Sequence, residues 1–175
     1  MTSFRFSPIG THEELIKAIT HVHFACFKLC YRFFGKYLPA SGNLGIFTHF
    51  DDEFAFLTKL REEMTDININ WNQKYYLLYR PVKIDDKRGD FPETTYKYLY
   101  IRRPDPDKPQ VGDIDLVLDK YEFDKLRVEV QKKKVVNGVE LFYRPDLNMI
   151  RLAADDTDAL PYITTKFMNE NVKES

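Results

Sequence analysis

The sequence predicts an α+β protein in which an N-terminal amphipathic helix precedes two strand-helix-strand-strand modules. A chain of 175 residues with 43% hydrophobic residues is long enough to bury one sizeable core. Its apolar residues change from helical spacing to alternation and back along the chain. The alternating segments follow one another through hairpin-like connections, which favours an α+β arrangement over a doubly wound parallel sheet.

The first predicted element is a long helix that begins after Thr11. Thr11 followed by Glu14 is a capping-box pattern, and Gly35 with Pro39 ends the helix near Phe34. One face of this helix is apolar. The basic residues of the other face form a stripe: Lys17, His21, Lys28 and Arg32.

The first module is predicted to span residues 44–103. A short apolar strand, 44–49, leads into a helix that begins at Asp51, where acidic residues suit the positive end of the helix dipole. Segments 74–80 and 94–102 are rich in Tyr, Leu, Thr and Ile, a composition typical of strands.

The second module is predicted to span residues 104–168, after a proline-rich loop that marks the best internal boundary. Segment 113–118 alternates as a strand, 120–132 is a predicted helix, and short strands follow at 139–143, 149–152 and 160–164. With an N-terminal helical segment, 1–43, and a polar tail, 169–175, the chain is interpreted as a single compact domain.

Composition excludes several classes of protein. The chain has 26 Lys plus Arg against 27 Asp plus Glu, a formal charge of −1, so the strong positive charge of a general nucleic-acid binder is missing. No apolar run is long enough to span a membrane, and the first residues do not follow a secretory pattern. Two cysteines do not make a disulfide framework. We therefore expect a soluble, cytoplasmic protein.

The second module resembles the βαβββ unit of the vicinal oxygen chelate family, the glyoxalase and dioxygenase fold. The resemblance is carried by Gly112–Asp119, Gly138–Pro145 and Met149–Asp156. It implies a curved mixed sheet that forms a ligand-binding cup. Family enzymes place a metal-binding His near the start of a module's first strand and a Glu on its last strand. Here Asp113 or Asp115 occupies the first of those positions, and segment 160–164 has no acid. We therefore expect ligand binding without a metal or another cofactor.

A row of aromatic side chains is the best candidate binding surface. Tyr96, Tyr98, Tyr100 and Arg102 alternate onto one face of the predicted strand, with Leu99 and Ile101 on the other. If the leucine and isoleucine are buried, the tyrosines and the arginine are left to line a cleft for a flat or anionic ligand. The alternative is that the same rings form the core.

Two further functions are weighed against this binding domain. The first is a lyase or isomerase of the vicinal oxygen chelate type that uses His49 with Asp51 as catalytic residues. The second is an RNA or protein interaction module, which would use the basic stripe together with the tyrosines. Separately, His23, Cys26 and Cys30 share one helical face. They are either core residues or soft ligands for zinc.

Overall fold

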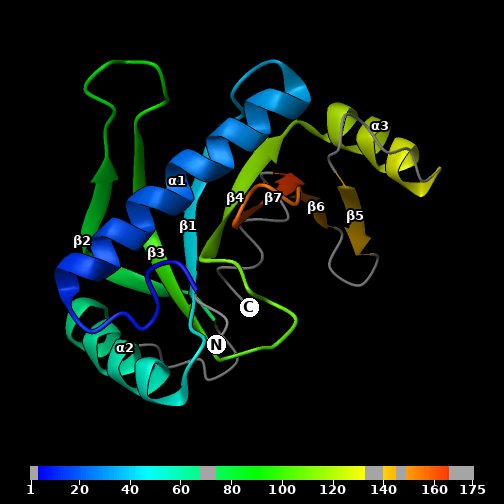
Figure 1. Cartoon of the computed structure of the whole chain (residues 1–175). Coiled ribbons are helices and arrows are strands. Elements are labelled where there is room, and N and C mark those ends of the chain that lie inside the picture. The colour runs from blue at the N-terminus through cyan, green and yellow to red at the C-terminus, as the bar shows by residue number, and fades with distance from the viewer. Residues whose placement is uncertain (1–3, 68–73, 133–139, 145–148, 166–175) are drawn as a thin grey trace.

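The computed structural model describes residues 4–67, 74–132 and 149–165, together with the backbone of 140–144. The chain forms three helices and seven strands in the described residues (Figure 1). The helices are α1 (His12–Phe34), α2 (Asp51–Met64) and α3 (Lys120–Gln131). The strands are β1 (Ala40–Phe47), β2 (Tyr76–Ile84), β3 (Thr94–Arg102), β4 (Gly112–Leu118), β5 (Glu140–Arg144), β6 (Met149–Ala153) and β7 (Ala159–Thr165). The α+β class and the leading helix are confirmed.

The seven strands form one mixed sheet in the order β2-β3-β1-β4-β7-β6-β5. The strands of the first module occupy one half of this sheet and those of the second module the other. Each half places its first strand parallel to its last, β1 beside β3 and β4 beside β7. The two halves meet at β1 and β4, which pair antiparallel. The predicted tail, 169–175, lies outside the described residues.

Helix α1 forms as its capping residues predict. The Thr11 hydroxyl accepts a hydrogen bond from the Glu14 amide at 3.1 Å, and the Glu14 carboxylate accepts one from the Gly10 amide at 2.8 Å. At the other end Gly35 adopts a left-handed conformation, φ +67°, which glycine adopts without steric cost.

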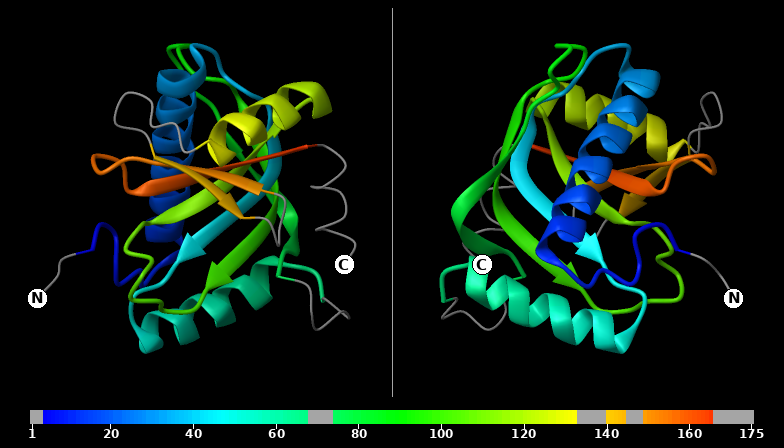
Figure 2. Two further views of the ribbon diagram at one scale, coloured as in Figure 1. Left: turned by 90° about the vertical axis from the view of Figure 1, so that its right-hand side faces the viewer. Right: turned by 60° about the vertical axis from the view of Figure 1, so that its left-hand side comes forward.

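The apolar face of α1 crosses the middle of the sheet (Figure 2). Its buried residues form one core with residues of α2 and α3 and with the strand residues that face α1. Leu44, Leu99 and Ile114 are among these strand residues. His23, Cys26 and Cys30 are buried in this core, and both thiols are free. Within the described residues no group of three or more His, Cys, Asp or Glu side chains converges on a point.

Two strand boundaries differ from the prediction. β1 begins at Ala40 rather than at residue 44, because the turn-like sequence around Gly42, φ +89°, forms a bulge in the β1–β4 pairing. β2 continues through Pro81 to Ile84, since β2 is an edge strand, where a missing amide donor is tolerated. Among the described helices, none is both long and apolar enough to cross a membrane.

Candidate functional site

The face of the sheet opposite the shared core is polar near the centre. Because neighbouring strands are in register, alternate residues of four strands gather there. We call this surface the polar face; its residues are Asn43, Tyr100, Arg102, Asp113, Asp115 and Tyr162. Asn43, Asp113, Asp115 and Tyr162 are buried, whereas Tyr100 and Arg102 are half-buried.

Tyr96 does not belong to this surface. It is buried under α1, where its hydroxyl lies 2.8 Å from His23 Nδ1. The alternation of buried and exposed residues along β3 shifts phase between Tyr96 and Leu99, at a place where the pairing with β2 also shifts register. As a result Leu99 and Ile101 face the core, as the cleft hypothesis required, but Tyr96 faces the core too.

The other three predicted residues share one face of β3, as predicted, but they line different cavities. Tyr98 lines a cavity of about 540 Å³ beside Gly42 and Phe27. Tyr100 and Arg102 instead line a cavity of about 720 Å³ at the end of the sheet where α2 meets β2 and β3. Of the four residues predicted to form one row, the structure therefore brings only two together in one cavity.

We call the second of these spaces the basic cavity, because four of its lining side chains are cationic. They are Arg61, Lys74, Arg102 and Arg103, and Asp105 is the one carboxylate among the lining residues that the structure describes. Its aromatic surfaces already carry guanidinium groups. Arg61 lies over the Tyr76 ring at 3.5 Å and Arg103 over Phe54 at 4.8 Å. These rings position the cations and are thereby covered on one side.

Arg61 is the most deeply buried of these cations. Its side chain is only 9% exposed, and Glu62 Oε1 lies 3.6 Å from its Nη2, which is beyond hydrogen-bond length. The Glu62 side chain is itself 65% exposed and therefore strongly solvated. A buried charge is costly when the nearest carboxylate among the described residues is solvated and beyond hydrogen-bond length, so this guanidinium favours a site that receives an anion.

Arg102 is partly compensated. Its Nη2 donates a hydrogen bond to Asp105 Oδ2 at 2.9 Å, and this bond lowers the pKa of the Asp105 carboxyl. Its Nε is buried and makes no hydrogen bond within the described residues. The guanidinium also lies 5.4 Å from the centre of the Phe47 ring, so it extends over β1. Arg102 therefore links the basic cavity to the polar face.

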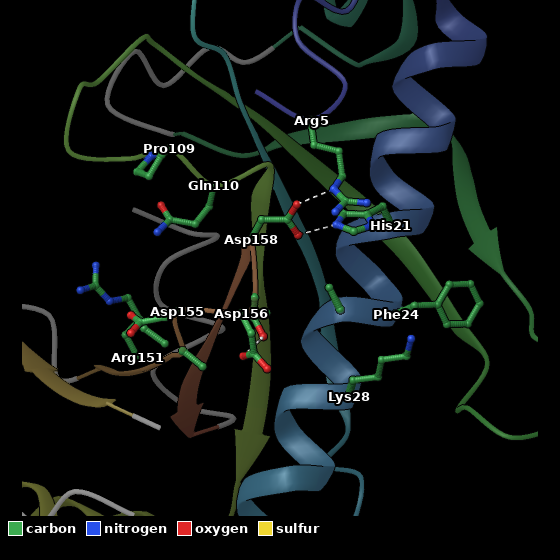
Figure 3. Close-up of a pocket in the computed structure, with 14 residues that line it drawn as sticks. Arg5, His21, Phe24, Lys28, Pro109, Gln110, Arg151, Asp155, Asp156 and Asp158 are labelled. Atoms are coloured by element: carbon green, nitrogen blue, oxygen red, sulfur yellow. Dashed lines mark hydrogen bonds and ion pairs between the residues drawn. The ribbon is translucent and has the colours of Figure 1, made fainter. Parts of the chain in front are cut away.

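A larger cavity, of about 1050 Å³, lies between α1 and the turn that joins β6 to β7 (Figure 3). Its charges are largely matched within the chain. Asp158 lies 2.7 Å from Arg5 Nε and 2.5 Å from His21 Nε2 (Figure 3). Lys28 and Asp155 line it as well. This cavity is lined by both cationic and acidic side chains, so its described residues do not have the excess of positive charge found in the basic cavity.

The basic stripe of α1 is mostly engaged in ion pairs. Lys17 pairs with Glu13 at 2.8 Å, His21 pairs with Asp158, and Arg32 makes two hydrogen bonds to Asp156 at 2.9 and 3.0 Å. Lys28, the fourth member, is exposed. The stripe is therefore poorly suited to neutralising the phosphates of a nucleic acid.

His49 and Asp51, the predicted catalytic pair, have different environments. His49 Nδ1 lies 2.6 Å from Ser7 Oγ, and its ring stacks on Phe4 with centroids 3.9 Å apart. Asp51 is exposed at the start of α2. The carboxylate near His49 is Glu53, which accepts hydrogen bonds from the His49 amide, the Ile9 amide and the Ser7 hydroxyl. Because this carboxylate accepts hydrogen bonds from residues 7 and 9 as well as from His49, the cluster holds the N-terminal segment in place.

Sequence reasoning missed two residues of interest. Arg61 was indistinguishable from the many cations that favour the last turn of a helix, here α2. Asp113 was considered only as a substitute for a metal ligand. The Asp-Ile-Asp spacing of β4 was a usable signal for Asp113, because it places two carboxylates on one face of a central strand.

Comparison with known proteins gives little beyond the fold. No family model matches the chain, and no curated protein matches it in sequence. The structure is similar to a solved structure described as a structural genomics protein, EC4020, with a TM-score of 0.59 and 13% sequence identity. The match covers 100% of this chain and 98% of that chain. At this level of identity the likeness shows a shared fold alone.

Proposed function

We propose that the protein binds a small anion in the basic cavity. The observation that carries the proposal is the buried guanidinium of Arg61, whose counter-ion Glu62 is solvated and 3.6 Å away, in a cavity whose described lining residues include four cations and one carboxylate. Guanidinium groups suit phosphate and carboxylate oxygens, because they offer paired N–H donors in one plane. Since Tyr76 and Phe54 already hold cations, the ligand is selected by charge rather than by stacking of a flat ring.

The resemblance to the vicinal oxygen chelate family remains part of this proposal. It is supported by the similar arrangement of the two halves of the sheet. In each half the first strand lies parallel to the last. Under this proposal the protein is a cytoplasmic binding domain that works without metal chemistry. The lyase alternative is less favoured, because Ser7 engages the His49 ring and Asp51 is exposed.

Calorimetric titration of the full chain with sulfate tests the proposal. We expect saturable binding of one sulfate, and we expect Arg61→Gln to weaken it about tenfold or more, since each hydrogen bond to a charged group contributes roughly 1.5–3 kcal/mol. Arg32→Gln is the matched control. It removes the same charge from an exposed ion pair with Asp156, outside the cavity lining, and should leave the affinity unchanged.

Two outcomes would contradict the proposal. The first is an equal loss of affinity in both variants, which would indicate non-specific attraction to the surface. The second is no saturable binding at millimolar sulfate. Circular dichroism of each variant establishes that the substitution has not unfolded the chain.

A further inference from the structure

The carboxyl group of Asp113 lies at the centre of the polar face. Asp113 is paired with Gly45 of β1, and its Oδ1 occupies the space that a side chain at position 45 would need. The Tyr100 ring borders the same space from β3. Glycine at position 45 therefore allows a carboxyl group of β4 to extend across β1 toward β3.

The groups that face Asp113 come from every neighbouring strand. They are Asp115 on β4, Asn43 on β1, Tyr100 and Arg102 on β3, Tyr75 just before β2, Tyr162 on β7, and Lys108 in the loop before β4. Burial and the charge of Asp115 raise the pKa of Asp113 to about 7, and the charges of Arg102 and Lys108 oppose this rise. Asp115 in turn accepts a hydrogen bond from the side-chain amide of Asn43, Nδ2, at 3.1 Å.

Arg102 belongs to both parts of the site. It lines the basic cavity, and its guanidinium lies over Phe47, the residue of β1 that follows Gly45 on the same face. Arg102 and Asp113 are two strands and two residues apart, which corresponds to roughly 12 Å between their α-carbons. The long arginine side chain shortens the distance between the charges, and buried charges are only weakly screened by salt.

We propose that the basic cavity takes up a proton together with its anion, and that the carboxyl pair of Asp113 and Asp115 holds this proton. The inference rests on the proposed anion binding. When the pair holds one proton it carries one negative charge instead of two, so more of the field of Arg102 acts on the anion. When the pair is fully ionised, the carboxylates offset Arg102 and repel the anion.

Thermodynamic linkage requires the reverse effect as well. An anion bound at Arg102 removes part of the positive field that favours ionised Asp113, so the carboxyl group gains protons when the anion binds. The affinity for the anion is therefore highest at acidic pH and falls as Asp113 ionises. The effect needs no direct contact between the anion and Asp113.

Sulfate is the probe, because it remains a dianion from about pH 5.5 to 8.5 and its own charge does not change. We expect the dissociation constant to rise about three- to tenfold across this range. At a pH near neutrality, calorimetry in two buffers with different ionisation enthalpies counts the protons taken up. We expect a positive fraction of one proton per sulfate bound, a measurement that needs no variant.

The variant Asp113→Asn provides the second part of the experiment. The amide resembles the protonated carboxyl group, so this variant should bind sulfate tightly at both pH limits and take up no proton. Loss of pH dependence in the variant supports the proposal. Unchanged pH dependence in a folded Asp113→Asn would overturn it and assign the effect to another group, such as a histidine.

The two proposals fail in different ways. If wild-type protein binds sulfate with the same affinity at every pH and takes up no proton, the coupling is wrong and anion binding stands. If no sulfate binds at any pH, the binding function itself is wrong, and the coupling falls with it.

Discussion

At the scale of single residues, the buried pair of His23 and Tyr96 has a predictable effect on stability. Burial lowers the pKa of His23 to about 4, below its ordinary value near 6.5. The folded protein therefore resists protonation of this ring, and the contribution of His23 to stability is complete above about pH 6.5 and lost as the pH falls toward 4.

A comparison of wild type with His23→Gln tests this effect. We expect the difference between their free energies of unfolding to change by about 2 kcal/mol from pH 7 to pH 5, with wild type losing more. Urea denaturation at both pH values measures it. A difference that does not depend on pH would mean that His23 is not the titrating group.

Asp113 changes the pH dependence of stability in the direction opposite to His23. Its pKa in the folded chain, about 7, lies above the ordinary value of 3.8, so the folded state binds the proton more tightly than the unfolded state. The stability that this provides is complete below about pH 4 and is lost as the pH rises through 7. We expect wild type to lose on the order of 4 kcal/mol relative to Asp113→Asn between pH 4 and pH 8. Urea denaturation of both proteins at these two pH values checks it, and parallel pH profiles would contradict it.

The residues of β3 show what the alternation of side chains along a strand can and cannot predict. The period of two placed Tyr100 and Arg102 on the face opposite Leu99 and Ile101, because that part of β3 is regular. It misplaced Tyr96, because the shift of register against β2 depends on partner residues that lie 14 to 21 positions away in sequence. The basic cavity was not predicted either, because Arg61 belongs to a helix and meets Arg102 of β3 only in the folded chain.

At the scale of elements, a buried carboxylate joins the N-terminal segment to α2. Glu53 accepts hydrogen bonds from the Ile9 amide and the His49 amide, each at 2.8 Å, and from the Ser7 hydroxyl at 2.9 Å. The acids at 51–53 were predicted to favour the start of a helix, and α2 does begin at Asp51. Burial of Glu53 depends on the N-terminal segment, which no local pattern predicts.

We expect Glu53→Ala to destabilise the chain by at least about 2 kcal/mol, because it leaves the buried Ile9 amide and the part-buried His49 amide without this partner. The exposed neighbouring variant Asp51→Ala should cost less than about 1 kcal/mol. Denaturation of both variants gives the free energies. Hydrogen exchange should show faster exchange of the Ile9 amide in Glu53→Ala alone, and slow exchange of that amide would refute the proposed role of Glu53.

At the scale of the whole molecule, α1 joins the two halves of the sheet. The helix packs against β1 of the first half and against β4, β6 and β7 of the second. Ion pairs tie the same surfaces together, with Arg32 bound to Asp156 and Arg5 bound to Asp158. The order of elements predicted the α+β class and the leading helix, which the structure confirms. The contacts that join the two halves into one core connect residues far apart in sequence, so the expectation of a single compact domain rested on chain length and not on any local pattern.

A shared core predicts that the two halves unfold together. Phe27 lies fully buried on α1, and Phe27→Ala should cost about 3–5 kcal/mol through lost burial and the cavity it leaves. We expect one denaturation transition, with the same midpoint by circular dichroism and by tyrosine fluorescence, in wild type and variant alike. The slope against denaturant should not change, since the same surface is exposed on unfolding. If Phe27→Ala instead produced two separate transitions, the halves would be independent folding units that α1 only covers.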